Sequence, residues 1–285
     1  MYPSMDEGFP DELSSDAIQK GLKTEWLGRQ PIFCFGVVET TNIEANRLAR
    51  EGKPEGTLVV ADAQTKGRGR LGRTWISPPG TGLYCSIVLR PACVPDRLPV
   101  LTLAAGVAGA AAIQQVGLTP ELKWPNDVLI SGRKVGGILT EIVFDRKKID
   151  FVILGIGINV NTEAEAFPAS FKKQATSLKL SLGKPVSRIA LVQNLLAKFE
   201  DYYRLFSKGD SLSIIHSWSE LDSTLGREVE VALPEGRLLG MAEAVGPDGT
   251  LLVRDITNRL HRIVAGDVVH CRPDPFTVHR SPFTD

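Results

Sequence analysis

Four short apolar segments between residues 121 and 161 constrain the fold of this chain more than any other feature. They read ELKW (121–124), DVLI (127–130), KVGGILTEIVF (134–144) and FVILGIGINVN (151–161). Apolar runs of this length, bounded by turn residues, are typical of β-strands. Connections such as SGRK (131–134) are too short for a crossover helix, so we expect these strands to be antiparallel neighbours in one sheet.

Helical and strand patterns on both sides of this run indicate an α+β fold, with a mixed β-sheet and flanking helices. The helix at 188–206 is the clearest, because Val192, Leu195, Leu196, Phe199 and Tyr203 recur at helical spacing. The other expected elements are a short helix over 12–23, strands at 31–38, 57–65 and 82–91, a helix that follows TTN (40–42) and ends near Gly52, and a long alanine-rich helix at 99–117.

The sequence pattern changes near Gly226, from long helical segments to short strands and turns. The segments REVEVAL, RLLGMAEAVG, TLLVRDI and LHRIVAGDVVHCRP read as short strands joined by turns such as PDG. They predict a small C-terminal β-barrel of about 50 residues. We therefore divide the chain into an N-terminal extension (1–29) that is partly disordered with a short helix, a main domain (30–222), the barrel (223–275) and a tail (276–285).

Composition and charge argue against several classes of protein. The chain has 285 residues, 43% of them hydrophobic, with 33 basic and 33 acidic side chains. A protein that binds nucleic acid through bulk charge is usually more basic. The four cysteines are scattered, which fits reduced thiols and argues against a disulfide framework or a zinc site. The helix at 99–117 contains Gly106 and Gln114, and the acidic N-terminus has no apolar segment, so we expect a soluble, cytoplasmic protein.

The stretch KGRGRLGRTW (66–75) is unusually basic and rich in glycine, and it directly follows an expected strand. Its glycines permit backbone conformations closed to other residues and let N–H groups approach a ligand. Arg68, Arg70 and Arg73 supply forked donors suited to phosphate or carboxylate. The Walker A pattern is absent. Chemistry alone leaves two interpretations open, a phosphate-binding loop that orders on its ligand and a solvated basic hairpin.

A second motif, KWPNDVLISGRKVGGIL (123–139), places Lys123 and Lys134 near the two ends of an expected hairpin. A cation among apolar strand residues is costly unless it meets an anion. Asn126 and Asp127 are suited to a sugar, an amide or a metal, and the following glycine pair suggests the close approach of a ligand or of another backbone. The alternative is a surface hairpin whose lysines extend into solvent.

Two further motifs each have a plain structural explanation and a functional one. In GIGINVN (155–161) an apolar strand ends in Asn159 and Asn161, whose amides need partners if they are buried. In ETTN (39–42) the threonines are typical of a helix cap, and the same helix N-terminus can present hydroxyl and amide groups to a polar ligand.

Taken together and in order, ETTN, QTKGRGRLGRTW, KWPNDVL, RKVGGILTE and GIGINVN resemble the biotin protein ligases. The resemblance covers about residues 30 to 275 and implies a class II synthetase-like catalytic domain that binds biotin and ATP, followed by an SH3-like barrel. It also implies a reaction in two steps. Biotin is activated by ATP to biotinyl-5′-AMP, and biotin then passes to a lysine of a biotin carboxyl carrier protein, such as a subunit of acetyl-CoA carboxylase.

By similarity, the motif residues are expected to fall into three groups. The residues expected at biotin are Thr40, Thr41, Asn42, Gln64, Arg68, Gly69, Arg70, Lys134 and Gly137. Those expected at ATP are Arg70, Arg73, Trp75, Asn126, Lys134, Asn159 and Arg272. The expected catalytic residues are Lys134, Arg70, Lys123 and Asp127, with Asp127 helping to deprotonate the acceptor lysine. No residue is assigned to a resident metal, and Mg²⁺ is expected to accompany ATP.

Two other functions compete with this interpretation. A lipoate–protein ligase has a similar fold and chemistry, but lipoate lacks a ureido ring, so Gln64 and the threonine turn favour biotin. A biotin-sensing DNA-binding regulator of this family carries a winged helix-turn-helix, and only about 39 residues precede Thr40. We therefore expect no nucleic-acid or membrane partner, and a monomer or a homodimer.

Overall fold

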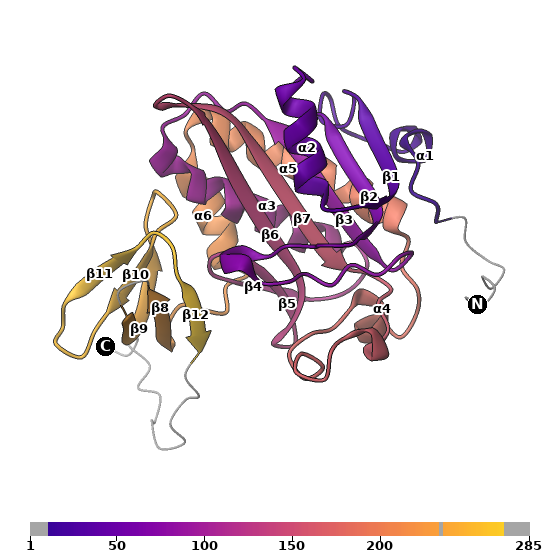
Figure 1. Ribbon diagram of the computed structural model, residues 1–285. Coiled ribbons are helices and arrows are strands. Elements are labelled where there is room, and N and C mark those ends of the chain that lie inside the picture. Colours follow the sequence, from indigo (N-terminus) through magenta and orange to yellow (C-terminus); the bar gives the residue numbers. More distant parts are fainter. Residues whose placement is uncertain (1–10, 234–235, 271–285) are drawn as a thin grey trace.

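The computed structural model describes residues 11–233 and 236–270, which form two β-sheets with helices packed around the larger one (Figure 1). The larger sheet contains β1 (Ile32–Val38), β2 (Leu58–Gln64), β3 (Gly82–Leu89), β4 (Pro120–Lys123), β5 (Asp127–Ile130), β6 (Arg133–Asp145) and β7 (Lys148–Asn159). Their order is β1-β2-β3-β7-β6-β5-β4. The four strands from β4 to β7 are antiparallel neighbours, as the short connections predicted.

Strands β1 and β2 are parallel, and helix α2 (Thr41–Arg50) connects them. Thr40 caps this helix, because its hydroxyl accepts a hydrogen bond from the Ile43 N–H (3.0 Å). Parallel strands end at the same edge of a sheet. The threonine turn after β1 and the basic loop after β2 are therefore neighbours, although more than twenty residues of chain separate them.

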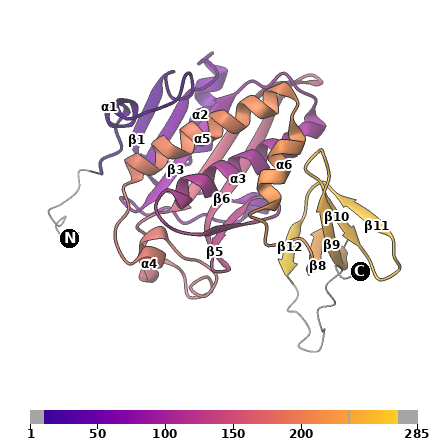
Figure 2. The same cartoon turned by 180° about the vertical axis from the view of Figure 1, so that it is seen from behind.

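Helices α3 (Leu98–Gln114) and α5 (Arg188–Lys208) lie across the face of the sheet opposite to α2 (Figure 2). Helix α6 (Ser211–Ser219) packs beside them. Among the described residues, α3 with the turn that precedes it is the one helix long and apolar enough to span a membrane. Most of its side chains are buried against the sheet, α5 and α6. Gly106 of α3 faces Leu122 of β4 and Ile138 of β6, within the buried core. Helix α3 is thus a core helix, as its glycines and glutamines indicated.

Residues 11–30 pack against α5. Helix α1 (Ser15–Lys20) is shorter than the predicted helix over 12–23, and Gly21 ends it. The buried Glu200 carboxylate accepts hydrogen bonds from three consecutive N–H groups at residues 25–27 (2.8–3.1 Å). The buried Arg188 pairs with Asp11 (2.9 Å). This segment therefore completes the core. Disorder was expected over residues 1–11, but Asp11 is held by Arg188. Residues 1–10 lie outside the described range.

The second sheet contains β8 (Glu228–Leu233), β9 (Gly236–Val245), β10 (Leu251–Arg254), β11 (Leu260–Ile263) and β12 (Asp267–His270), in the order β11-β10-β9-β8-β12. All of its strand pairs are antiparallel, in agreement with the expected SH3-like unit. The indole N–H of Trp124, after β4, donates to the Gly249 carbonyl (3.0 Å). The β9–β10 turn is thereby fastened to the KWPN segment. Helices that the sequence patterns did not reveal are α6, α4 (Leu178–Leu182) and the 3₁₀ turns Arg70–Gly72, Pro95–Arg97 and Ala164–Ala166.

Three of the four cysteines lie among the described residues, and all three carry free thiols: Cys34, Cys85 and Cys93. Burial raises the pKa of Cys85 to about 12, so this thiol stays protonated and unreactive in the core. Cys271 lies outside the described residues.

Candidate active site

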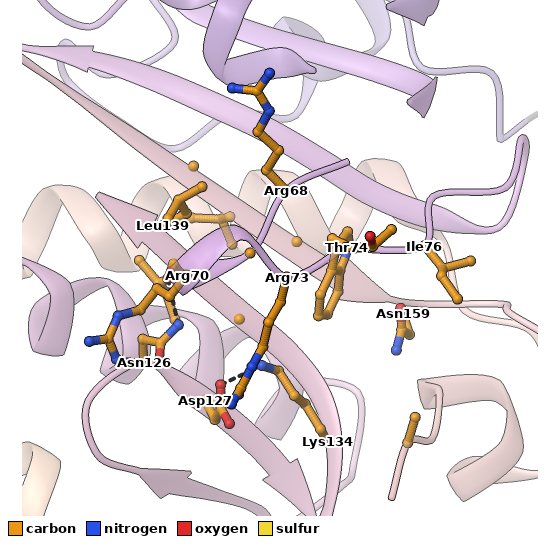
Figure 3. Close-up of a pocket in the computed structure, with 18 of the residues that line it drawn as sticks. Arg68, Arg70, Arg73, Thr74, Ile76, Asn126, Asp127, Lys134, Leu139 and Asn159 are labelled. Atoms are coloured by element: carbon orange, nitrogen blue, oxygen red, sulfur yellow. Dashed lines mark hydrogen bonds and ion pairs between the residues drawn. The ribbon is translucent and has the colours of Figure 1, made fainter. Parts of the chain in front are cut away.

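One large cleft, of about 980 Å³, gathers the motifs at one face of the larger sheet. It is lined by the threonine turn, Gln64, the basic loop, β4 to β7 and the start of β12. Arg70 and Arg73 extend toward Asn126, Asp127 and Lys134, whereas Arg68 points the other way (Figure 3). Segments that are distant in the sequence thus form a single site.

The threonine turn and Gln64 form the polar end of this cleft. The Thr41 N–H donates to Gln64 Oε1 (2.9 Å), and Gln64 Nε2 donates to Ser77 Oγ (2.8 Å). This pair of contacts fixes which end of the Gln64 amide is the donor. Thr41 and Asn42 are buried at the start of α2. The same turn therefore caps a helix and lines the site, so the two interpretations of ETTN are compatible.

The glycines of GIGINVN leave room for two neighbouring side chains. A Cβ on Gly155 would lie 2.2 Å from Asn42 Oδ1, and a Cβ on Gly157 would lie 2.8 Å from the Trp75 indole. No real Cβ approaches another heavy atom so closely, so both positions require glycine. The asparagine that ends this strand, Asn159, is buried and donates to the Thr176 carbonyl (3.1 Å).

Replacing Gly155 with alanine is expected to displace Asn42 and to raise KM for biotin about tenfold or more, because the threonine turn loses its packing. KM for ATP should change little. The measurement is steady-state kinetics of adenylate formation with each substrate varied in turn. Gly36→Ala is the matched control, because Gly36 is a strand glycine whose added Cβ would meet nothing within 4 Å. Equal effects of the two substitutions would contradict this account.

The basic loop folds back on itself as a small hairpin. The Gly69 N–H donates to the Arg73 carbonyl (2.7 Å), and the Trp75 N–H donates to the Gly67 carbonyl (2.8 Å). One side of the hairpin reaches into the cleft, where Arg70 donates to Asn126 Oδ1 (3.3 Å). Arg73 forms a two-pronged ion pair with Asp267 of β12, which ties the loop to the second sheet.

Arg68 is placed differently from the other two loop arginines. Its guanidinium lies 3.8 Å from Glu39, next to the Lys66–Glu39 pair (3.2 Å). It lines the cleft but directs its charge outward. Its expected contact with biotin therefore stays a prediction.

Lys134 is held at the centre of the site. Its ammonium group pairs with Asp127 (2.5 Å) and lies 5.6 Å from the centre of the Trp75 ring. Gly137, three residues further along β6, leaves space for the Lys134 side chain, since a Cβ there would lie 3.3 Å from Lys134 Cε. At Gly136 the predicted approach of another backbone is confirmed, since a Cβ there would lie 3.1 Å from the Gly157 carbonyl oxygen. At Gly137 the neighbouring group is the Lys134 side chain.

Two further cations in the cleft have no carboxylate partner within ion-pair distance among the described residues. Burial lowers the pKa of Lys123, an effect that Asp127 and Asp267 only partly offset at longer range. Burial likewise lowers the pKa of Arg70. A half-buried cation is stabilised by a bound anion. The cleft is therefore prepared for anionic ligands.

Most residues predicted from the motifs line this one cleft, with three qualifications. Arg272 lies outside the described residues. Asp127 is engaged with Lys134, so its role toward the acceptor lysine stays a prediction. Trp75 packs against β7 and Lys134, and its place near an adenine stays a prediction.

Six residues of the site or its hydrogen-bond network were not predicted from the sequence: Ser77, Ser86, Glu141, Gly155, Gly157 and Asp267. The alternation of glycines in GIGIN could have revealed the two glycines as points of close approach.

Comparison with known proteins agrees with this geometry. Residues 35–159 match the model of the Biotin/lipoate A/B protein ligase family. The chain is 38% identical over 260 residues to the "Bifunctional ligase/repressor BirA" of Bacillus subtilis, an alignment that covers 91% of this chain and 79% of that protein. The chain belongs to the biotin/lipoate ligase family.

Other relatives of the family support the same assignment. The "Biotin--[acetyl-CoA-carboxylase] ligase" of Mycobacterium tuberculosis is 34% identical, covering 83% of this chain and 88% of the relative. Among solved structures, the "Biotin protein ligase from Aquifex aeolicus in complex with biotin and ATP" matches with a TM-score of 0.73 and 32% identity, over 85% of this chain and 99% of that one. The family resemblance carried by the five motifs is confirmed.

Proposed function

We propose that this chain is an ATP-dependent biotin ligase that forms biotinyl-5′-AMP and transfers biotin to a lysine of a biotin carboxyl carrier protein. One observation carries this proposal. A single cleft joins a neutral polar end, at Thr41 and Gln64, to a cluster of half-buried cations that includes Lys123 and Arg70. A neutral ureido ring fits the first region, and a carboxylate beside a triphosphate fits the second.

The cations suit the first chemical step. A carboxylate oxygen of biotin attacks the α-phosphorus of ATP, the bond from that phosphorus to the bridging oxygen breaks, and pyrophosphate leaves. Two anions must be brought together while negative charge grows on the phosphate oxygens. Fixed cations in a water-poor cleft oppose that repulsion and stabilise the transition state. Lys134, held by Asp127 at the centre of the cleft, is assigned to the reacting carboxyl and α-phosphate.

The second step needs no covalent enzyme intermediate. The acceptor amine attacks the acyl carbon of biotinyl-5′-AMP, loses a proton and expels AMP. The adenylate must therefore be retained until the acceptor arrives. The basic loop, anchored through Arg70 to Asn126 and through Arg73 to Asp267, is placed at the cleft to provide that cover.

Biotin is favoured over lipoate by the polar end of the cleft. Gln64 offers a fixed N–H donor, and the threonine turn offers hydroxyl groups, which an apolar dithiolane ring would leave unpaired. The M. tuberculosis relative also carries the name of a biotin ligase rather than of a lipoate ligase.

The remaining assignments complete the proposal. Mg²⁺ enters with ATP as its counter-ion, since the carboxylates Asp127 and Asp267 are already paired with Lys134 and Arg73. The acceptor is the carrier subunit or domain of acetyl-CoA carboxylase or of another biotin-dependent carboxylase. The protein acts in the cytoplasm as a monomer or homodimer, without nucleic acid, and its catalytic and barrel domains divide near residue 222.

The lowered pKa of Lys123 predicts a pH dependence of ATP binding. Lys123 must be protonated to attract phosphate, and its lowered pKa means that it loses its proton at a lower pH than an ordinary lysine. KM for ATP should therefore rise as the pH approaches the ordinary lysine pKa of about 10.4 from below. In Lys123→Arg the rise should disappear, because a guanidinium stays charged over that range. Superimposable profiles for the two proteins would remove Lys123 from ATP binding.

The proposed function is tested by transfer to a carrier. Purified protein is incubated with ATP, Mg²⁺, labelled biotin and a biotin carboxyl carrier domain. We expect one labelled lysine on the carrier and none on a carrier whose acceptor lysine is replaced by arginine. Absence of label on the intact carrier would contradict the proposal.

A further inference from the structure

A row of hydrogen bonds at the polar end of the cleft leads from Thr41 to a carboxylate on β6. Thr41 Oγ1 lies 2.7 Å from Ser86 Oγ, which lies 2.6 Å from Asn42 Oδ1. Asn42 Nδ2 in turn donates to Glu141 Oε2 (2.6 Å). Thr41, Asn42 and Glu141 all line the cleft, and the fully buried Ser86 joins Thr41 to Asn42 beneath its surface.

The carboxylate fixes the direction of every hydrogen bond in the row. An ionised carboxylate only accepts, so Asn42 must turn its NH₂ group toward Glu141 and its carbonyl oxygen toward Ser86. Ser86 has one proton, and it must donate that proton to Asn42, because two oxygens 2.6 Å apart without a hydrogen between them repel each other. The 2.7 Å contact between the two hydroxyls then requires Thr41 to donate to Ser86. The other acceptor near the Thr41 hydroxyl, Gln64 Oε1, lies 3.4 Å away, which is too long to compete for the proton.

We propose that Glu141 is a positioning residue that sets the hydrogen-bond polarity of the biotin site; this inference rests on the proposed function. With its proton committed to Ser86, Thr41 Oγ1 presents only lone pairs to the cleft. Gln64 presents the opposite polarity, because its Oε1 accepts the Thr41 N–H and its Nε2 is a donor. An acceptor beside a donor complements the N–H and C=O of a ureido ring.

The packing around Asn42 supports a role that is exerted through Thr41. Both ends of the Asn42 amide are engaged, and Gly155 leaves no spare space beside its oxygen. Asn42 thus transmits the polarity set by Glu141. Glu141 itself is exposed on a strand whose hydrogen bonds do not depend on its side chain, so it can be replaced without disturbing the core.

Two substitutions of Glu141 distinguish the loss of its hydrogen-bond acceptor from the loss of side-chain packing. Glu141→Leu removes the short acceptor and leaves Asn42 Nδ2 only the Leu139 carbonyl at 3.5 Å, beyond the usual hydrogen-bond range. The Asn42 amide is then held weakly, and Thr41 loses its fixed polarity. Glu141→Gln keeps an oxygen that can still accept from Asn42. We measure the Kd for biotin by calorimetry, KM for ATP by pyrophosphate exchange, and Tm.

The leucine variant is expected to raise Kd for biotin about tenfold, the effect of losing roughly one well-oriented hydrogen bond. Dethiobiotin, which keeps the ureido group and lacks the ring sulfur, should lose affinity by the same factor. KM for ATP should stay within about twofold, and the glutamine variant should stay within about threefold of the parent for biotin.

Three results would overturn the inference. They are an unchanged Kd for biotin in Glu141→Leu, an equal loss in Glu141→Gln, and a rise in KM for ATP that matches the loss for biotin. These outcomes are distinct from failure of the proposed function, which would appear as a parent protein that does not bind biotin at all.

Discussion

Replacing Lys134 with alanine is expected to lower the rate of biotinyl-adenylate formation by about two to three orders of magnitude. Lys134 is the cation at the centre of the cleft, between Asp127 and the Trp75 ring, and it is assigned to the charge that develops on the α-phosphate. The loss should fall on kcat more than on KM for biotin, because the ureido contacts lie at the other end of the cleft. Single-turnover formation of the adenylate measures the step directly.

Lys179→Ala is the matched control for this experiment. Lys179 also forms one carboxylate pair, with Glu163, and its side chain is exposed to a similar degree, 34% against 35% for Lys134. It lies outside the cleft, so its loss should leave the rate unchanged. A near-normal rate in folded Lys134→Ala would remove Lys134 from the mechanism.

Replacing Arg70 with glycine is expected to release biotinyl-5′-AMP into solution about 10 to 100 times faster, the effect of losing a charged hydrogen-bonding group from the cover of the cleft. The structure anchors the loop through Arg70 to Asn126, and glycine adds backbone freedom at the same position. The free adenylate should then biotinylate lysines on unrelated proteins. The measurement is the escape of labelled adenylate on a filter, together with labelling of a bystander protein.

Lys66→Gly is the matched control, because it adds backbone freedom to the same loop without removing the Arg70 guanidinium. Lys66 lies in the same loop, but its side chain is exposed and pairs with Glu39 at the outer side. We expect its adenylate to be retained as in the parent protein. If labelling in Arg70→Gly stays confined to the carrier, Arg70 does not close the site.

Much of the fold was accessible from the sequence because it follows local patterns. The strands from 121 to 161 have short connections that admit only antiparallel pairing, and the structure shows that pairing. The helix at 188–206 has strong periodicity and appears as α5. The helix expected over 12–23 was too long, because Gly21 packs against the Gln193 amide and ends it after Lys20. That contact joins residues far apart in the chain.

Only those residues of the candidate site that lie in recognisable motifs could be predicted from the sequence. Lys134, Arg70 and Gln64 lie in recognisable stretches, and the structure brings them to one cleft. Glu141 and Asp267 gave no signal, because a single acidic residue on a strand is ordinary. Their importance comes from partners, Asn42 and Arg73, that are about 100 and 200 residues away in the chain, and only the tertiary structure joins them.

The most direct test of the account is isotope exchange between pyrophosphate and ATP. We expect exchange that requires biotin, saturates with it and is not supported by lipoate, because the cleft pairs a ureido-complementary end with a cationic end. Exchange that lipoate supports as well as biotin does, or an absence of biotin-dependent exchange by the folded protein, would contradict it.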